Sequence, residues 1–254
     1  MSEKRALSLY PEHVSFHIDI PDKTVCDVLH ERAAQFSSHP ALTFYGKTIT
    51  YAELVAAVNR FASSLQTLGV QKGDRVAIML PNCPQYVIAY YGILQAGAIV
   101  TQVNPMLVER ELAYVLNDSG AETIIIYEPL YPRLAAVREG TAIKRAVTVS
   151  FGAPSSASLA AEDVTFDEFL AEGSGQVRPV PIEPAHDVAV LQYTGGTTGR
   201  SKGAMLTHRN IFANVLQCAE FFKGTFEMGK ERYLTVIPLF HVFAMTSGMN
   251  LAIY

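Results

Sequence analysis

The sequence predicts an α/β fold in which mostly parallel sheets are flanked by helices. Short apolar runs such as residues 74–81 alternate with stretches of helical spacing such as residues 84–97 through several units. Strands that alternate with helices in this way form parallel sheets with helices on both faces. Of the 254 residues, 49% are hydrophobic and 17% are charged, which is enough apolar material for a large buried core.

The first expected elements are two helices separated by a pair of short strands. Residues 21–36 are expected to form a helix capped near Thr24, and the two strands are expected around Gly46. Thr50, with Glu53 three residues later, forms a capping box that marks the start of the second helix.

The alternation then becomes regular. Each apolar strand pattern is followed by a helical pattern, and most of these helices end at a glycine. We expect strands at residues 74–81, 98–105, 121–127 and 144–150, and helices at residues 84–97, 107–120 and 131–140.

Residues 151–184 interrupt this alternation. They are rich in Gly, Pro and Ser, with one short helical pattern at residues 166–173, and are expected to form an exposed connection. The sequence therefore predicts two parts: residues 1–184 as a first α/β subdomain with its connecting loop, and residues 185–254 as the start of a second subdomain.

The second part contains the remaining elements. Strands are expected at residues 187–194, 203–208 and 232–238, with a helix at residues 210–222 that is capped by Thr207. The apolar segment after these elements stops without a cap, turn or polar tail, so we expect that the chain is truncated.

Composition excludes several classes of protein. The net charge is −4, with no cluster of Lys and Arg, which argues against a nucleic-acid partner. Three widely spaced cysteines and an N-terminus without an apolar signal segment indicate reduced thiols in a cytoplasmic protein. Residues 76–108 carry no charge, but prolines, glycines and amides interrupt them, so they are expected to be buried elements rather than a membrane span.

The densest motif is YTGGTTGRSKG, residues 193–203. Its glycines allow consecutive backbone N–H groups to converge on an anion, its threonines add hydroxyl donors, and Lys202 adds positive charge. The P-loop of NTPases is excluded because Ser201 and Gly203 flank the lysine. The dinucleotide fingerprint is excluded because the first glycine is missing and a strand, not a helix, is expected next. A plain hairpin turn remains the ordinary alternative, although a turn has no use for three threonines and a lysine.

This loop resembles the phosphate loop of the adenylate-forming superfamily, which contains acyl-CoA synthetases, luciferases and peptide-synthetase adenylation domains. The family form Tyr/Phe-Thr-Ser/Gly-Gly-Thr-Thr-Gly-x-x-Lys-Gly is matched throughout, with Ser201 where many members have proline. Residues 49–54, 94–105 and 238–243 resemble three further core motifs in the expected order. The chain is most similar to bacterial long-chain fatty-acid–CoA ligases, which implies an incomplete N-terminal large domain of such an enzyme.

The resemblance implies two half-reactions. A carboxylate attacks the α-phosphorus of ATP to give an acyl-adenylate and pyrophosphate, and the thiol of coenzyme A then displaces AMP. Positioned donors and Mg²⁺ would stabilise the charge that develops on the pyrophosphate. The residues implied are Thr194, Gly195, Gly196, Thr197, Thr198, Gly199 and Lys202 for the ATP phosphates, Thr194 also for Mg²⁺, and His241 and Phe243 for the border of the acyl and adenylate pocket.

Similar enzymes carry later motifs, including the adenylation lysine, that do not occur here. The chain by itself is therefore expected not to adenylate a fatty acid, and ATP–pyrophosphate exchange well above background would contradict this. A non-catalytic nucleotide- or acyl-binding module stays open, as does a ligase for an aryl, short-chain or amino acid. Peripheral membrane contact also stays open because the expected substrate is a fatty acid, although no basic amphipathic helix marks such contact.

Overall fold

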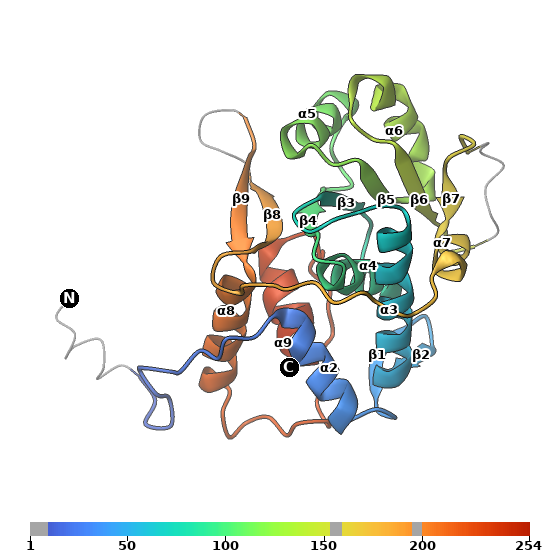
Figure 1. Ribbon diagram of the computed structural model, residues 1–254. Coiled ribbons are helices and arrows are strands. Elements are labelled where there is room, and N and C mark those ends of the chain that lie inside the picture. Colours follow the sequence, from blue (N-terminus) through green and yellow to red (C-terminus); the bar gives the residue numbers. More distant parts are fainter. Residues whose placement is uncertain (1–9, 153–158, 195–199) are drawn as a thin grey trace.

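The computed structural model describes residues 10–152, 159–194 and 200–254. Within these residues the chain forms a seven-stranded sheet in the order β7-β6-β5-β3-β4-β8-β9, together with a two-stranded hairpin, β1-β2 (Figure 1). The strands are β1 (Pro40–Phe44), β2 (Lys47–Thr50), β3 (Arg75–Met79), β4 (Ile99–Gln102), β5 (Thr123–Tyr127), β6 (Arg145–Val149), β7 (Val164–Thr165), β8 (Val188–Thr194) and β9 (Lys202–Thr207).

Helices pack on both faces of the large sheet. One apolar cluster contains residues of α2, α3, α4 and α8, and a second contains residues of α5 and α6. The helices are α2 (Val25–Gln35), α3 (Tyr51–Thr67), α4 (Pro84–Gln95), α5 (Glu109–Ser119), α6 (Tyr131–Val137), α7 (Phe166–Glu172), α8 (His208–Phe221) and α9 (Leu251–Ile253), with the shorter turns η1 (Glu128–Leu130) and η2 (Arg138–Gly140) and the π-helical η3 (Ala244–Asn250).

The central strand β3 explains the uninterrupted apolar run in the sequence. Val76 and Ile78 point into the first cluster, whereas Ala77 and Met79 point into the second. Successive side chains of a strand point to opposite faces, so a strand covered on both faces needs apolar residues at every position. The predicted fold class, a mostly parallel sheet flanked by helices, is confirmed.

The order of the strands reverses at β3. The chain passes from β3 to β4 on one side and then returns to β5 on the other side of β3. α4 consequently covers one face and α5 the opposite face. In open sheets of this kind, ligands bind beyond the carboxyl ends of the strands at the point where the order reverses.

Threonine caps fix where the helices begin. Thr24, Thr50, Thr165 and Thr207 each accept a hydrogen bond from the third residue of the helix that follows, in a capping box. The predicted caps at Thr24, Thr50 and Thr207 are therefore confirmed. The β1–β2 turn has positive φ at Tyr45 and Gly46, 46° and 77°, and glycine at the second position adopts this conformation without strain.

One expected strand is wrong. Residues 232–238 form no strand, and Leu234 and Val236 are 88% and 75% exposed. Their backbone bonds instead to a side chain, because the Asn82 amide donates to the carbonyl oxygens of Thr235 and Ile237 at 3.1 and 2.9 Å. No described strand lies alongside to supply a ladder partner. The residues after them are helical, as η3 and α9.

Strands from both sides of the predicted division at residue 184 lie in one sheet. β8 pairs in parallel with β4, and β9 pairs antiparallel with β8. Before β8, the connection runs along α3, where the Gln66 amide donates to the carbonyl oxygen of Arg178 at 2.9 Å. The division into residues 1–184 and 185–254 stays a prediction. No described helix is long and apolar enough to cross a membrane.

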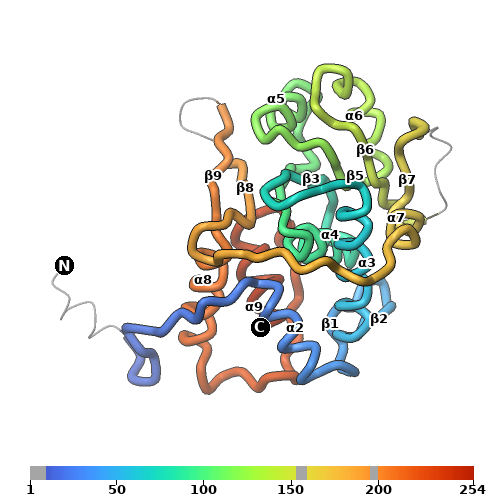
Figure 2. The backbone as a smooth tube through the Cα atoms, in the orientation of Figure 1, coloured from blue at the N-terminus to red at the C-terminus, as the bar shows by residue number. Residues whose placement is uncertain are grey.

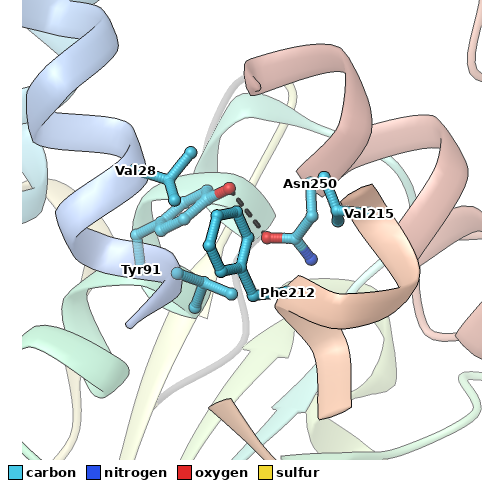
Figure 3. A pocket seen from close by; sticks show the side chains of 6 residues that line it. Val28, Tyr91, Phe212, Val215 and Asn250 are labelled. Atoms are coloured by element: carbon cyan, nitrogen blue, oxygen red, sulfur yellow. Dashed lines mark hydrogen bonds between the residues drawn. The ribbon is translucent and has the colours of Figure 1, made fainter. Parts of the chain in front are cut away.

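Buried polar contacts fasten the last helical turns to the first part of the chain. The Tyr91 hydroxyl donates to Oδ1 of Asn250 at 2.9 Å (Figure 3). The Asn250 amide donates to the Tyr90 hydroxyl at 3.2 Å. Figure 2 shows the C-terminus lying beside α2, where the Arg32 guanidinium donates to the carbonyl oxygen of Tyr254 at 2.5 Å. The cavity in Figure 3 measures only about 10 Å³, no more than one water can occupy, so it is a packing gap.

Candidate active site

The candidate site lies at the end of the sheet where the parallel strands have their carboxyl ends, which is called the carboxyl edge below. β3, β4 and β8 are parallel, so their carboxyl ends meet at this edge. Thr194 ends β8, and Asn82 follows β3. Asn82 receives a hydrogen bond from Leu239 N at 2.7 Å, which draws the segment before His241 across the edge. The segment therefore approaches the strand end that carries the glycine-rich loop.

The structure brings the two described ends of the loop together. Thr194 and Lys202 are register partners across the β8–β9 pair, and both are exposed. Ser201 donates from its hydroxyl to the carbonyl oxygen of Thr194 at 2.8 Å, which closes the loop at its base. The predicted phosphate-binding residues Gly195, Gly196, Thr197, Thr198 and Gly199 lie outside the described residues, so their roles stay predictions.

Thr194 and Lys202 suit a phosphate ligand. Register partners on an antiparallel pair have their side chains on the same face, so the hydroxyl and the ammonium point to the same side of the hairpin. A flexible ammonium beside a hydroxyl donor is a common phosphate-binding pair. The described residues contain no cluster of three His, Cys, Asp or Glu side chains that could hold a metal by themselves. The contact of Thr194 with Mg²⁺ stays a prediction.

Tyr193 and Gly203 are the next pair along the β8–β9 ladder. They are register partners, and a Cβ atom added to Gly203 would lie 3.1 Å from Cζ of the Tyr193 ring. Glycine therefore lets the ring lie across β9. The Tyr193 hydroxyl donates to Oδ2 of Asp118 at 2.7 Å. Burial, and then this hydrogen bond to a carboxylate, raise the pKa of the Tyr193 phenol.

His241 and Phe243 lie at the start of the last helical segment. Both are exposed, Phe243 by 57%. The backbone N–H of Phe243 donates to Nδ1 of His241 at 3.3 Å, so the other ring nitrogen, Nε2, is the one free to meet a ligand. The positions agree with a pocket border, although no contact to a ligand tests that role.

Two buried glutamines link the strand ends to this segment. Gln102 of β4 and Gln192 of β8 are register partners and are 2% and 7% exposed. The Gln192 amide donates to the carbonyl oxygen of Phe240 at 3.1 Å, and the Gln102 amide contacts Sδ of Met245 at 2.9 Å. The two glutamines therefore contact one residue before His241 and one residue after it in the sequence. The sequence analysis missed both, and the only signal was an amide ending an apolar strand.

An apolar cavity of about 180 Å³ adjoins the same turn. It lies between the first half of α8 and the start of the last helical segment, so one wall belongs to the element that carries His241 and Phe243. The surface that it exposes is mostly apolar, as contact with part of a hydrocarbon chain requires. Its lining residues are Leu206, Asn210, Ile211, Asn214, Val242 and Thr246.

The chain is similar in sequence to known proteins. The sequence profile of the AMP-binding enzyme family matches residues 29–254. A long-chain-fatty-acid–CoA ligase of Bacillus subtilis is 38% identical over 99% of this chain and 48% of its own length. A protein of the same name from Salmonella typhimurium is 37% identical over 97% of this chain and 48% of its own length. The chain thus spans about half the length of the curated relatives it matches.

Solved structures give the same result for the fold. The crystal structure of a long-chain-fatty-acid-CoA ligase from Archaeoglobus fulgidus superposes with a TM-score of 0.80 at 28% identity, over 95% of this chain and 48% of that chain. The family profile covers most of the sequence, including the described loop ends and the His241 turn. The chain therefore belongs to the AMP-binding enzyme family.

Proposed function

We propose that this chain forms the ATP-phosphate and acyl side of an ATP-dependent fatty-acid–CoA ligase. The observation that carries the proposal is the pairing of Thr194 and Lys202 at the carboxyl end of β8, in a chain that also has an apolar cavity at the His241 turn. A triphosphate needs the first environment and a fatty acyl chain needs the second. The names of the relatives, long-chain-fatty-acid–CoA ligases, support the same substrates.

The proposed reaction has two steps. A fatty acid carboxylate oxygen attacks the α-phosphorus of ATP, the bond to the β-phosphate oxygen breaks, and pyrophosphate leaves. The thiol sulfur of coenzyme A then attacks the acyl carbon of the adenylate, its proton is lost, and AMP leaves. Mg²⁺ bound with the ATP would supply positive charge. From this chain, Lys202 would supply charge to the leaving phosphates and Thr194 a hydroxyl hydrogen bond.

The apolar cavity receives the acyl chain in this proposal. His241 and Phe243 would border its mouth, where the carboxylate meets the α-phosphate. The protein would act in the cytoplasm, with peripheral contact to a membrane when it takes up a fatty acid. Residues 1–184 and 185–254 are proposed as two subdomains, with the site on the second.

The first test removes the charge. Lys202→Ala in the 254-residue chain is expected to weaken MgATP binding about ten-fold or more, because a charge-assisted contact to phosphate is lost. Isothermal titration calorimetry measures the dissociation constant. Lys223→Ala removes an exposed lysine just after the end of α8 and is expected to leave the constant unchanged. Equal affinity of the parent chain and Lys202→Ala would rule out the assigned role.

The second test fills the cavity. Thr246 is buried and lines it, so Thr246→Phe occupies space that an acyl chain would need. We expect palmitate to compete with a fluorescent fatty acid about ten-fold less well, while MgATP binding changes less than two-fold. Asn117→Ala, at an exposed position on α5 away from this cavity, is the control and should leave palmitate affinity unchanged. Unaltered palmitate affinity in Thr246→Phe would place the acyl site elsewhere.

A further inference from the structure

Two side chains of α5 reach the two ends of the glycine-rich loop. The Tyr114 hydroxyl donates to the carbonyl oxygen of Ser201 at 3.0 Å. Asp118 accepts the hydrogen bond of the Tyr193 hydroxyl at 2.7 Å. Residues four apart on a helix lie on the same face, so one face of α5 touches both loop ends. Ser201 directly precedes Lys202, and Tyr193 directly precedes Thr194.

The hairpin that carries these ends has few other supports. β9 pairs with β8 alone among the described strands, and it is the outermost strand of the sheet. Figure 1 shows the β8–β9 hairpin at one side of the sheet, with α5 on the side nearer the other strands. Without the contacts from α5, the spacing of Thr194 and Lys202 would depend on the hairpin's own hydrogen bonds and on the Ser201 hydroxyl.

We propose that Tyr114 and Asp118 are positioning residues for nucleotide binding. They hold the two strand ends in place. The Thr194 hydroxyl and the Lys202 ammonium are therefore already positioned to bind a nucleoside triphosphate before it arrives. The inference rests on the proposed function, because it takes ATP as the ligand of this loop. Holding a site in place before the ligand arrives lowers the ordering cost of binding.

The position of these contacts separates this role from support of the fold. Asp118 is exposed and Tyr114 is half-buried. A single surface hydrogen bond contributes little to the free energy of unfolding. Losing such a hydrogen bond at the end of a loop instead lowers the affinity of the loop for its ligand. Removing either contact should therefore alter phosphate binding while the thermal midpoint scarcely moves.

The experiment uses four variants of the full chain. Tyr114→Phe removes only the hydroxyl, and Asp118→Ala removes the acceptor. Asp118→Asn keeps an acceptor oxygen and serves as the conservative rescue. Asn117→Ala is the matched control, because Asn117 lies on the same helix and donates to the carbonyl oxygen of Gly140 at 2.8 Å, away from the loop.

Two readouts are measured for each variant. The first is the rate of trypsin cleavage after Arg200 and Lys202 without nucleotide, which reports how firmly the loop ends are held. The second is the dissociation constant for MgATP and for tripolyphosphate. We expect Tyr114→Phe and Asp118→Ala to be cleaved several-fold faster and to bind both ligands about three- to ten-fold more weakly, a change of ~0.6–1.4 kcal/mol.

The controls decide between outcomes. Asp118→Asn and Asn117→Ala are expected to stay within two-fold of the parent in both readouts. If the parent chain binds MgATP and the two test variants bind it equally well, the positioning role is overturned and the proposed function stands. If the parent chain binds neither ligand, the proposed function fails and this inference with it. A fall of more than 10 °C in the thermal midpoint of both test variants would assign these contacts to the fold instead.

Discussion

His208 is a histidine that the fold keeps neutral. It opens α8 directly after the Thr207 cap, it is 2% exposed, and its Nδ1 has no hydrogen-bond partner in the described part of the chain. Burial lowers the pKa of His208 to about 4, and it outweighs the nearby carboxylates of Asp187 and Asp27, which raise it. Charging this ring would place an unpaired positive charge inside the protein.

The depressed pKa predicts an acid-sensitive fold. Between the folded pKa of about 4 and the unfolded value of 6.5, the unfolded chain binds the proton more tightly. Stability from this group is therefore complete above pH 6.5 and is lost as the pH falls toward 4. The free energy of unfolding should be about 2 kcal/mol lower at pH 5 than at pH 7.5. Urea titrations at the two pH values measure it.

A variant isolates the histidine from other acid effects. His208→Gln cannot titrate, so its stability should change much less between the two pH values. The carboxylates with lowered pKa, such as Glu53 and Asp187, lose their contribution only below their ordinary values of 4.5 and 3.8. The interval above pH 4.5 therefore separates them from His208. An equal pH response in His208→Gln would show that another group is responsible.

Only some site residues could be predicted from the sequence. Thr194 and Lys202 belong to a local motif, and a hairpin brings them together whatever the rest of the fold. Gln102 and Asp118 have no such local signal. Their contacts depend on β8 pairing with β4 and on α5 crossing beside β8, and both relationships join residues far apart in the sequence.

At the scale of elements, α7 packs closely against α3 because of one glycine. A Cβ atom added to Gly173 would lie 2.1 Å from the carbonyl oxygen of Arg60, which is backbone and cannot turn aside. Nearby, the ring of Phe61 contacts those of Phe166 and Phe169 at centroid distances of 5.5 and 5.1 Å. The close approach at the end of α7 thus sets the packing distance between the Phe61 ring of α3 and the two rings of α7.

Substitution of this glycine should separate the two helices. Gly173→Ala is expected to lower the free energy of unfolding by about 1–3 kcal/mol, the usual cost of forcing extra atoms into a packed contact. Gly140→Ala is the matched control, because a Cβ atom there meets nothing within 4 Å. Chemical denaturation of both variants tests the difference. Equal stability would mean that α7 shifts without cost.

Helix starts were predictable because a capping box is complete within four residues, as at Thr50 and Thr207. The strand expected at residues 232–238 was not, because a strand also needs a neighbour. Apolar alternation is present there, but the backbone bonds to Asn82 and the side chains of Leu234 and Val236 face solvent. The short strand β7 was missed for the opposite reason, since pairing with β6 defines it more than its own two residues do.

At the scale of the molecule, one buried amide joins the last helical segment to α4. Asn250 contacts Tyr90 and Tyr91 of α4 and the carbonyl oxygen of Met245 in its own turn. Asn250→Leu would leave two tyrosine hydroxyls buried without this partner. Each buried polar group that loses its partner costs ~1–3 kcal/mol. The expected loss of stability is therefore about 2–4 kcal/mol.

This prediction has a simple comparison. Asn214→Ala removes an exposed asparagine of α8 whose side chain donates a hydrogen bond to Gln217, and it should change stability by no more than ~0.5 kcal/mol. Thermal unfolding followed by circular dichroism measures both. A smaller loss in Asn250→Leu than in Asn214→Ala would refute the structural role of the buried amide.

The class of the fold followed from alternation alone, whereas the strand order did not. Strand–helix units imply parallel pairing. However, no local sequence signal predicts that β5 pairs with β3 on the side opposite β4, or that β8 pairs with β4. Nor does any local signal show that strands on both sides of residue 184 share a sheet. The strand order and the shared sheet depend instead on how the helices pack against the two apolar faces of the sheet.

The pairing of β8 with β4 also has a consequence for biosynthesis. Val190 lies beside Val100 in the sheet, and about 90 residues separate them in the chain. A ribosome adds ~5–20 residues per second, so β4 waits roughly 5–18 s for its neighbour. During that interval its hydrogen-bonding edge is open to other chains. The nascent protein should therefore be most prone to aggregation, and most dependent on a chaperone, before β8 has left the ribosome.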